Sequence, residues 1–449
     1  MKTLRPLSLF AAIFCCLIPT VVSAAETVAT PASTPPSAIF DVTKFGAKGD
    51  GTTLDSDAIQ KALDACDKAG GGIVELPKGT YLSKPIFLHS NLTLQVDEGA
   101  ILQARDLSAD FANPAGRGVI AFVNASNLTN VAITGKGRID GAGARWWPPV
   151  REAKRTNMPE PEVRPRMIIF ANCKNVRIQD VTLTNSPSFH LVPRDCTDVL
   201  IQGVTIRAPA DSPNTDAIDP STCQHIVIDH CTLDVGDDNV AIKSGHNDPA
   251  HPNAACANII VSNCTMLHGH GMSIGSETNG GVSNMTVSSC TFQDTVSGIR
   301  IKSDRTRGGL VSNITYRDLT MHNVHNPILI TSYYPNIPAT DTAQPVTART
   351  PIYKDIHIIN VTSDSTSAAG SIVGLPEMPA ENITLENVQL TAGSGLTVRN
   401  AKGLQFTKVK IDAKKGPAVI VQGNVTMTGP DAPTISPPPA PSVQGTVTP

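Results

Sequence analysis

Four short clusters of chemically active side chains follow one another through the middle of the chain. They are Asn214-Thr215-Asp216, Gly236-Asp237-Asp238, Gly269-His270-Gly271 and Arg300-Ile301-Lys302. Carboxylates that share a site can divide the roles of proton donor and base, which is what cleavage of a glycosidic bond requires. The two cations of the last cluster would suit a sugar polymer that itself carries negative charge.

The intervals between the clusters match a structural repeat. They are 21 residues from Asp216 to Asp237, 33 from Asp237 to His270 and 30 from His270 to Arg300. Each interval fits one turn of a coiled repeat, with or without a loop insertion, so stacked coils would gather these side chains on one patch. Because alternate strand residues face the same way, Arg300 and Lys302 would share a face.

Each cluster also has a structural explanation when it is taken alone. A single Asp in a turn, such as Asp216, usually hydrogen-bonds its own backbone. His270 between two glycines fits an ordinary loop residue, and Arg300 and Lys302 fit a solvated strand face. The coincidence of all four clusters at the spacing of a coil favours a shared site instead.

A phrase of one polar residue, alternating apolar residues and a turn recurs through the chain. It opens at Asn175, Asp198, His225, Asn258, Asn284, Asn313, Asp355 and Asn382. Successive openings are 23 to 42 residues apart, which indicates a fixed coil with loop insertions. An antiparallel sandwich would not repeat one phrase. We therefore predict an all-β fold, a right-handed single-stranded parallel β-helix of about ten coils.

The ends of the 449-residue chain differ from this repeat. Residues 1–24 have the basic start, apolar core and small-residue end of a secretory signal. Residues 25–38 are rich in Ala, Thr, Pro and Ser and predict a flexible leader, and the Pro-rich residues 429–449 predict a disordered tail. The β-helix is expected over 39–428, with a short capping helix at about 53–69 because Ile59, Leu63 and Cys66 there follow helical spacing.

Composition excludes several classes of partner. The net charge of −3 and the pI of about 6.4 are not those of a nucleic-acid-binding protein. After the signal, no segment is apolar enough to span a bilayer, so we expect an exported, secreted protein without a membrane partner. We also expect a monomer. Aromatic residues make up only 4%, so sugar recognition should rest on charge and hydrogen bonds.

The cysteines form two ladders. Cys173, Cys196, Cys223 and Cys256 precede the apolar part of a phrase, whereas Cys231, Cys264 and Cys290 occupy one later position. Stacked strands lie about 4.8 Å apart, close to the spacing that a disulfide needs. Buried free thiols also pack as small apolar groups, and we favour this second explanation.

Taken in this order, NTD, GDD, GHG and RIK resemble the motifs of the polygalacturonases of glycoside hydrolase family 28. The resemblance runs from the FGAKGDG segment at 45–51 to about Gly423. It implies a parallel β-helix that hydrolyses α-1,4-linked galacturonan, in polygalacturonate or pectin, with inversion. No further Asp/Glu set looks like a calcium site, so we expect neither a metal nor a cofactor.

The resemblance also implies roles for the catalytic side chains. Asp237 matches the general acid, and Asp216 and Asp238 match the pair that activates water. His270 matches a group that tunes the acid. The residue after the first motif is Ala217, where many relatives have Gly, and this small change leaves the assignment in place.

Four further positions are implied to bind the substrate. Arg300 and Lys302 match the residues that bind a uronate carboxylate, and Asn214 lies in the first motif. Relatives carry a Tyr shortly after the RIK strand, for which Tyr334 fits best and Tyr333 is second.

Other functions remain open at this point. The enzyme could act from a chain end or on a substituted pectin such as rhamnogalacturonan, although we expect endo action on plain galacturonan. A pectate lyase would want a Ca²⁺ site and a lone Arg base. A non-catalytic β-helix adhesin would give no reason for the four clusters to coincide.

Overall fold

The computed structural model describes residues 38–116, 118–245, 255–365 and 367–432, which belong to one compact unit. The predicted signal sequence lies outside the described residues, as do nearly all of the leader and most of the tail. The division of the chain into these segments therefore stays a prediction.

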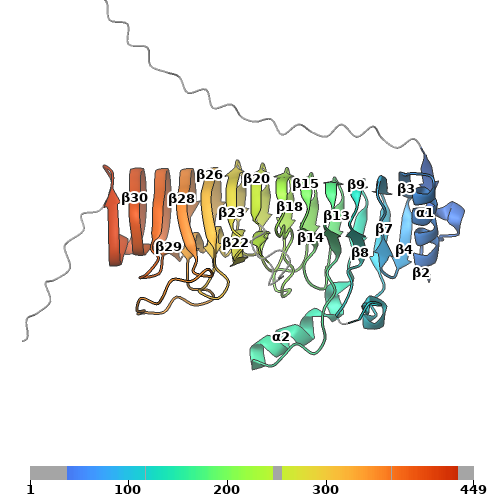
Figure 1. The fold of residues 1–449 in the computed structure, drawn as a ribbon, viewed down its shortest axis with the longest axis horizontal. Coiled ribbons are helices and arrows are strands. Elements are labelled where there is room, and N and C mark those ends of the chain that lie inside the picture. The colour runs from blue at the N-terminus through green and yellow to red at the C-terminus, as the bar shows by residue number, and fades with distance from the viewer. Residues whose placement is uncertain (1–37, 117, 246–254, 366, 433–449) are drawn as a thin grey trace, which may run out of the picture. The chain divides into compact units, whose positions relative to one another are not determined.

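Each turn of the chain contributes up to three short strands, which pair in parallel with the equivalent strands of neighbouring turns. The strands stack into three parallel sheets around a common core from helix α1 (Ser56–Lys68) to strand β30 (Ala380–Thr428) (Figure 1). Parallel crossover connections are right-handed in nearly all proteins. The predicted right-handed parallel β-helix is confirmed.

The strands fall into three stacked series. The first sheet contains β1 (Ile39–Asp41), β3 (Gly72–Leu76), β6 (Leu92–Val96), β9 (Thr129–Thr134), β12 (Lys174–Gln179), β15 (Thr197–Gln202), β17 (Gln224–Asp229), β20 (Cys256–Ser262) and β23 (Val282–Ser288). The second contains β2 (Asp50–Leu54), β4 (Gly79–Ser83), β7 (Ala100–Ala104), β10 (Arg138–Asp140), β13 (Thr182–Thr184), β16 (Thr205–Arg207), β18 (Thr232–Asp234), β21 (Thr265–Leu267) and β24 (Thr291–Gln293). The third contains β5 (Ile86–Phe87), β8 (Val123–Ser126), β11 (Ile168–Ala171), β14 (Leu191–Arg194), β19 (Val240–Ser244), β22 (Met272–Thr278), β25 (Ser297–Lys302), β27 (Asn326–Thr331) and β29 (Ala368–Val373). Strands β26 (Leu310–His322) and β28 (Ile352–Asp364) continue the first two sheets, and β30 continues all three.

The third sheet has an inward ladder of isoleucines. Ile242, Ile274, Ile301 and Ile330 lie opposite one another on consecutive strands and are fully buried. Their neighbours in sequence face outward, as the alternation around Ile301 predicts. The ladder thereby fixes the register of the side chains on the outer face.

The polar residue that opens each phrase has a backbone reason. All eight opening residues have positive φ, between 52° and 59°, a left-handed conformation that Asn and Asp adopt more readily than other non-glycine residues. Successive asparagines also hydrogen-bond along the stack, as Asn313 Nδ2 does to Asn284 Oδ1 at 2.8 Å. The repeated phrase therefore records a turn that every coil must make.

Two α-helices flank the described coils. Helix α1 covers the first strands, as expected, but begins at Ser56 because residues up to Leu54 belong to β2. Asp55 precedes the helix and accepts from the amides of Lys48 and Gly49 instead of capping it. Helix α2 (Trp147–Thr156) was not predicted; it projects beside the sheets (Figure 1), and Trp147 Nε1 ties its start to the carbonyl oxygen of Ser186 at 3.1 Å. Neither helix has the length and apolar run that a membrane crossing requires.

The predicted cysteine ladders are present, and the thiols are free. All eight cysteines of the described residues are buried and unpaired. Neighbouring thiols lie along the stack, and the amide of Cys173 points at Sγ of Cys196 at 3.4 Å. Burial raises the pKa of Cys256 to about 12, so these thiols serve as apolar packing groups.

Candidate active site

The predicted site residues lie where the chain enters the third sheet. Asp216 precedes residues 218–221, which bridge β14 to β19, and Asp237 and Asp238 lie directly before β19. His270 lies just before β22. Because these turns stack, they carry their side chains to one edge of the sheet.

The glycines beside His270 are required by close backbone contact. Gly269 and Gly271 have φ near +76° and +77°. A side chain on Gly269 would lie 2.4 Å from the carbonyl oxygen of Asp237, and one on Gly271 only 1.9 Å from that of Ser297. Thr215 joins the turns further, since its buried hydroxyl accepts from the amide of Gly236 at 3.0 Å. The motifs thus hold neighbouring coils in register.

Asp238 is held as an anion by three donors. Arg300 Nη1 and Ser273 Oγ each donate to Oδ1 at 2.8 Å, and Lys302 Nζ donates to Oδ2 at 2.7 Å. Burial opposes ionisation, but Lys302 and Arg300 outweigh it and hold the pKa of Asp238 well below its ordinary value. The carboxylate is only 2% exposed, so it is a fixed negative charge inside the wall.

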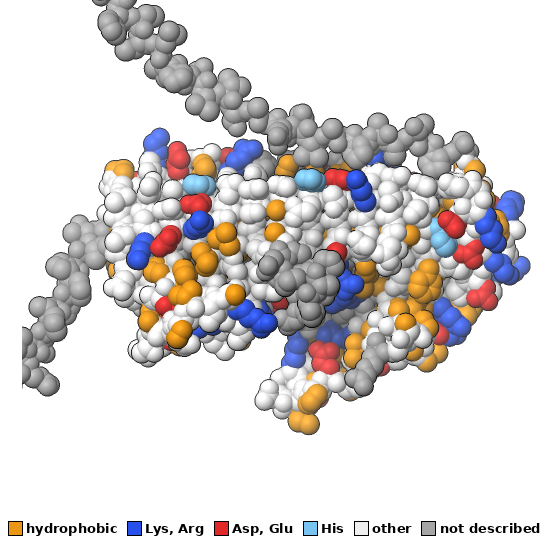
Figure 2. Space-filling view, in the orientation of Figure 1, with side chains coloured by type: hydrophobic (Ala, Val, Ile, Leu, Met, Phe, Trp, Pro, Cys, Tyr) orange, Lys and Arg blue, Asp and Glu red, His pale blue; other side chains and the backbone are white. Residues whose placement is uncertain are grey.

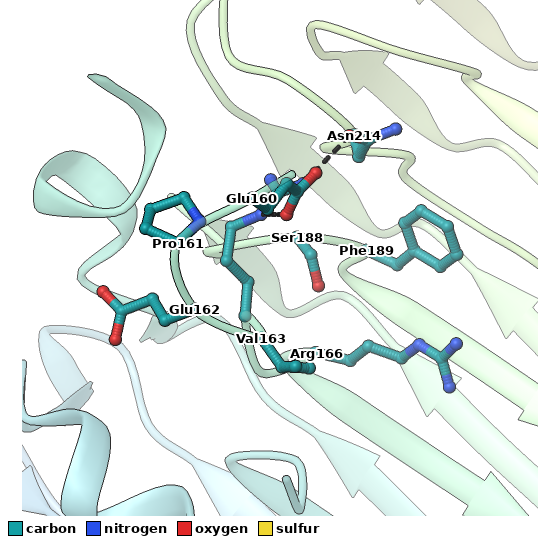
Figure 3. Close-up of a pocket in the computed structure, with 9 residues that line it drawn as sticks. Glu160, Pro161, Glu162, Val163, Arg166, Ser188, Phe189 and Asn214 are labelled. Carbon is teal, nitrogen blue, oxygen red and sulfur yellow. Dashed lines mark hydrogen bonds and ion pairs between the residues drawn. The ribbon is translucent and has the colours of Figure 1, made fainter. Parts of the chain in front are cut away.

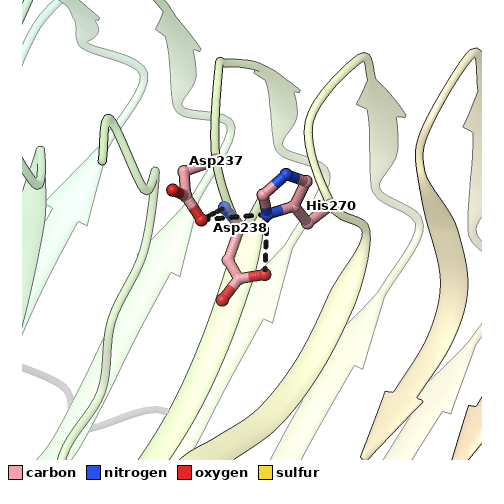
Figure 4. A group of neighbouring side chains, drawn as sticks. All are labelled: Asp237, Asp238 and His270. Atoms are coloured by element: carbon pink, nitrogen blue, oxygen red, sulfur yellow. Dashed lines mark hydrogen bonds and ion pairs between the residues drawn. The ribbon is translucent and has the colours of Figure 1, made fainter. Parts of the chain in front are cut away.

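Asp237 lies beside His270 (Figure 4), and its side chain is 19% exposed where that of Asp238 is 3% exposed. Nδ1 of His270 lies 3.0 Å from Oδ1 of Asp237 and 3.8 Å from Oδ1 of Asp238, although the ring makes no well-directed hydrogen bond through this atom. Asn214 Nδ2 approaches Oδ2 of Asp237 at 3.5 Å. Burial would raise the pKa of Asp237, but His270 and Lys302 lower it overall.

Asp216 belongs to a second ionic group. Lys243 Nζ donates to Oδ2 of Asp219 at 2.5 Å and lies 3.6 Å from Oδ2 of Asp216. Burial and the charge of Asp219 raise the pKa of Asp216 well above its ordinary value, against the opposing effect of Lys243. Oδ1 of Asp216 is buried without a hydrogen-bond partner among the described residues. His190 fixes the backbone here, since its amide and Nδ1 both donate to the carbonyl of Asp216.

The two tyrosines after the RIK strand lie in different places. Tyr334 is partly exposed, with its ring centroid 5.2 Å from Lys302 Nζ and 5.9 Å from the guanidinium of Arg300. Tyr333 is buried and donates to Asp341 at 2.6 Å. Of the two, Tyr334 is therefore the one beside Arg300 and Lys302, and its match to the family's tyrosine stays a prediction.

A metal ion is a poor fit here. Asp237, Asp238 and His270 present ligand atoms within 4.8 Å of one another. However, Arg300 and Lys302 already occupy both oxygens of Asp238, and their positive charges would repel a further cation. The donor set suits proton chemistry better than metal binding.

The eight predicted residues come together, and several others that the sequence motifs did not reveal lie among them. Asp219, Lys243 and Ser273 complete the ionic contacts, and Arg164 holds Asn214 through Oδ1 at 2.9 Å. A signal did exist for one pair, because Asp219 and Lys243 are 24 residues apart, close to the coil spacing that links Asp216 to Asp237. Ser273 also lies one coil before Arg300, which it faces on the neighbouring strand, whereas no such spacing pointed to Arg164.

The site therefore combines three carboxyl groups in different surroundings. Asp238 is a fixed anion, Asp237 lies next to the imidazole of His270, and Asp216 is buried with a raised pKa. The coexistence of ionised and protonated carboxyl groups at one pH is what general acid and base catalysis needs. The nearby cations give the same surface an attraction for anionic groups.

Comparisons with known proteins agree with this chemistry. The profile of "Glycosyl hydrolases family 28" matches residues 66–418. An endo-polygalacturonase of Pectobacterium parmentieri is 34% identical over 373 residues, covering 79% of this chain and 88% of that protein. The solved polygalacturonase of Erwinia carotovora ssp. carotovora is 30% identical with a TM-score of 0.67, covering 90% of this chain and 99% of that one. An exopolygalacturonase of Thermotoga maritima is 25% identical with a TM-score of 0.69, covering 88% and 92%.

Proposed function

The chain belongs to family 28 of the glycosyl hydrolases, and on this premise we propose that it is a polygalacturonase that cleaves the α-1,4 bonds of polygalacturonate and pectin. The observation that carries the proposal is Asp238 held between Arg300 and Lys302 beside Asp237. This arrangement joins acid–base groups to cations that attract a uronate carboxylate. We also propose that the enzyme is exported and acts as a monomer.

We assign the proton donor to Asp237, whose side chain is more exposed than that of Asp238. Asp216 and Asp238 would orient and deprotonate the attacking water, since both keep lone pairs that no described group fills. Arg300, Lys302 and Tyr334 would bind the substrate, with Asn214 supporting Asp237. His270 would tune the acid. The products would form with inversion, and a base acting through water is the arrangement that inverting glycosidases use.

The free site favours these roles only in part. Asp237 must be protonated to act as an acid and Asp216 must be ionised to act as a base, yet the pKa of Asp237 is lowered and that of Asp216 is raised. A bound galacturonate brings a negative charge to the same cluster, which disfavours ionised Asp237 and raises its pKa. We propose that the substrate itself thereby prepares the acid.

We propose endo action, which the name of the relative from Pectobacterium parmentieri supports. The exopolygalacturonase of Thermotoga maritima supports the alternative, removal of units from a chain end. Product sizes distinguish the two, because endo action releases mixed oligomers early whereas exo action releases one short product throughout.

One assay tests the proposal. Polygalacturonate is incubated with the enzyme in EDTA, while reducing ends, product sizes and absorbance of unsaturated uronides are followed. Saturated products that form in EDTA, with fully methyl-esterified pectin cleaved far more slowly, are expected. Unsaturated products would indicate a lyase, and an absence of new reducing ends would indicate a binding protein. Polarimetry or NMR of the first product would reveal inversion or retention.

A further inference from the structure

A pocket of about 480 Å³ adjoins the catalytic cluster. Ligand pockets in proteins are typically about 300–1,000 Å³. Its lining comes from the segment after α2 and from two later turns: Glu160, Pro161, Glu162, Val163, Arg164, Arg166, Ser188, Phe189 and Asn214. In Figure 2, basic and acidic side chains border the hollow between the α2-bearing arm and the coils. The mechanism proposed above uses only Asn214 from this set.

Most charges in the pocket wall are already paired. Glu160 pairs with Arg164 at 3.0 Å, and Glu162 pairs with Arg145 at 2.9 Å. Arg164 is buried and also donates to the carbonyl oxygens of Pro187 and Pro213. Its guanidinium is thus committed to holding the wall together.

Arg166 is different. Its guanidinium forms no hydrogen bond or ion pair with any described residue, and it lies 5.3 Å from the centroid of the Phe189 ring. Figure 3 shows both side chains extending to the same side, away from Glu162. The positive charge therefore has no ion-pair partner in contact with it, although the carboxylates of Asp219 and Asp216 act on it from further away, and the ring of Phe189 offers an apolar surface beside it.

The pocket lies on the opposite side of the carboxylates from Arg300. Arg166 precedes β11, whose register continues through β14 and residues 218–221 to β19, then β22 and β25. Asp216 and Asp237 enter the third sheet between these ends. Asn214 belongs both to the pocket and to the contact with Asp237. A polymer that lies across the acid would therefore meet Arg166 on one side and Arg300 with Lys302 on the other.

We propose that this pocket is a second uronate-binding subsite, in which Arg166 binds the carboxylate of a sugar unit on the far side of the scissile bond from Arg300. Phe189 packs against the apolar face of that sugar. The inference rests on the proposed function, since it assigns the subsite to the same anionic polymer. A forked guanidinium donates two parallel hydrogen bonds to a carboxylate. A neutral or methyl-esterified sugar has no carboxylate to accept them.

The test compares Arg166→Met with a matched control, Arg155→Met. Arg155 lies on α2, is exposed and pairs with Glu152, so its loss removes the same charge outside the pocket. Steady-state kinetics on oligogalacturonides of defined length are combined with mapping of the bond that is cut. Arg166→Met should raise KM about tenfold, as expected for the loss of one charge-assisted contact, and shift the position of cleavage. Arg155→Met should leave both unchanged.

Arg166→Lys provides a second variant that keeps the charge, and its KM should lie between wild type and Arg166→Met. Calorimetry also gives a readout that needs no turnover. It compares the binding of trigalacturonate to Asp237→Asn with its binding to the double variant that also carries Arg166→Met. Equal binding, or an unchanged KM and cleavage position, would overturn the subsite even if the wild type cleaves polygalacturonate. A wild type that neither cleaves polygalacturonate nor binds trigalacturonate would overturn the proposed function and the subsite together.

Discussion

Asp216 and Asp238 are both buried, but their surroundings push their pKa values in opposite directions. Asp238 has Lys302, Arg300 and a hydroxyl on its two oxygens, which keep it ionised despite burial. Burial and Asp219 dominate at Asp216, and Lys243 only partly offsets them. Neighbouring carboxyl groups in different surroundings thus differ in their affinity for a proton within one site.

At Asp237, the change to Asn removes the transferable proton and almost no volume. We expect kcat to fall by about 10²- to 10⁴-fold, the usual contribution of general acid catalysis, while binding of oligogalacturonides is retained. Single-turnover kinetics and calorimetry check the two parts. Asp64→Asn, on helix α1, is a control that should leave both unchanged. Retention of most of the activity in Asp237→Asn would move the acid role to another carboxyl group.

The pH dependence should report the effect of substrate on Asp237. As the acid, Asp237 must be protonated, so activity is lost as pH rises through its pKa. His270 and Lys302 lower this pKa in the free enzyme, and a bound uronate should raise it. The basic limb of kcat should therefore lie at higher pH than the basic limb of kcat/KM, which reports free enzyme. Coincident limbs would argue against this role for the substrate.

Lys243 should set the acid limb of the profile. The charges around Asp216 are Lys243 on β19, Asp219 on its own turn, and Asp237 and Asp238 on the next coil. Arg166, in the wall of the pocket, also acts on it. Lys243→Met removes the nearest positive charge, so the pKa of Asp216 should rise further. If ionised Asp216 activates water, the acid limb of kcat then moves to higher pH.

Lys243→Arg keeps the charge and should restore the wild-type limb at least in part. Thermal unfolding of both variants identifies any loss of folded protein, because Lys243→Met also leaves Asp219 buried without its partner. An acid limb that stays in place in folded Lys243→Met would show that Asp216 does not carry the base role.

The sequence indicated the residues whose types recur in short motifs, and it missed those whose role depends on how coils close. Asp216 and Asp237 stand out because they lie one coil apart. Arg166 gives no such signal. Its surroundings are set by Phe189 of the next coil and by the path of the chain after α2, and neither is visible in a local motif. Chemistry within a motif is local, whereas the partners of each charge are set by stacking.

At the scale of the element, the turns were more predictable than the insertion. The repeated polar openings predicted the strands because each coil needs the same left-handed residue. Helix α2 has no such repeat. Its signal was Pro148-Pro149 at the start, which suits the first turn of a helix, but its buried face is short and consists of Trp147, Val150 and Ala153. A single helix outside the repeat has no neighbouring coil to reveal it.

The left-handed turns should tolerate glycine better than alanine. Asn284 has φ of 56° and hydrogen-bonds Asn258 at 3.1 Å. Asn284→Ala places an ordinary side chain in this conformation and should cost about 1–2 kcal/mol, in addition to the lost hydrogen bonds. Asn284→Gly loses the same hydrogen bonds without that strain. Urea unfolding of the two variants should therefore separate them, with Gly the more stable, and equal midpoints would mean that the conformation does not select the residue.

At the scale of the whole unit, the coils share one continuous core. Inward residues of each coil contact those of the next, so stability is built from neighbouring interfaces. The cysteine ladders occupy part of this core across several coils, where each thiol fills the place of a small apolar side chain. Exposure of these thiols therefore measures how far the stack has opened.

The thiols should be free but protected in the native protein. All eight cysteines in the described part of the chain are buried, and burial raises the pKa of Cys66 to about 11 and of Cys256 to about 12. Since the thiolate is the reactive form, a thiol reagent should react slowly with native enzyme and with all eight thiols once unreduced protein is denatured. Reaction in rising urea should follow the loss of β-structure measured by circular dichroism. Loss of half of the thiols to disulfides in the denatured, unreduced count would contradict the ladder of free cysteines, and rapid labelling without unfolding would mean that the coils open locally.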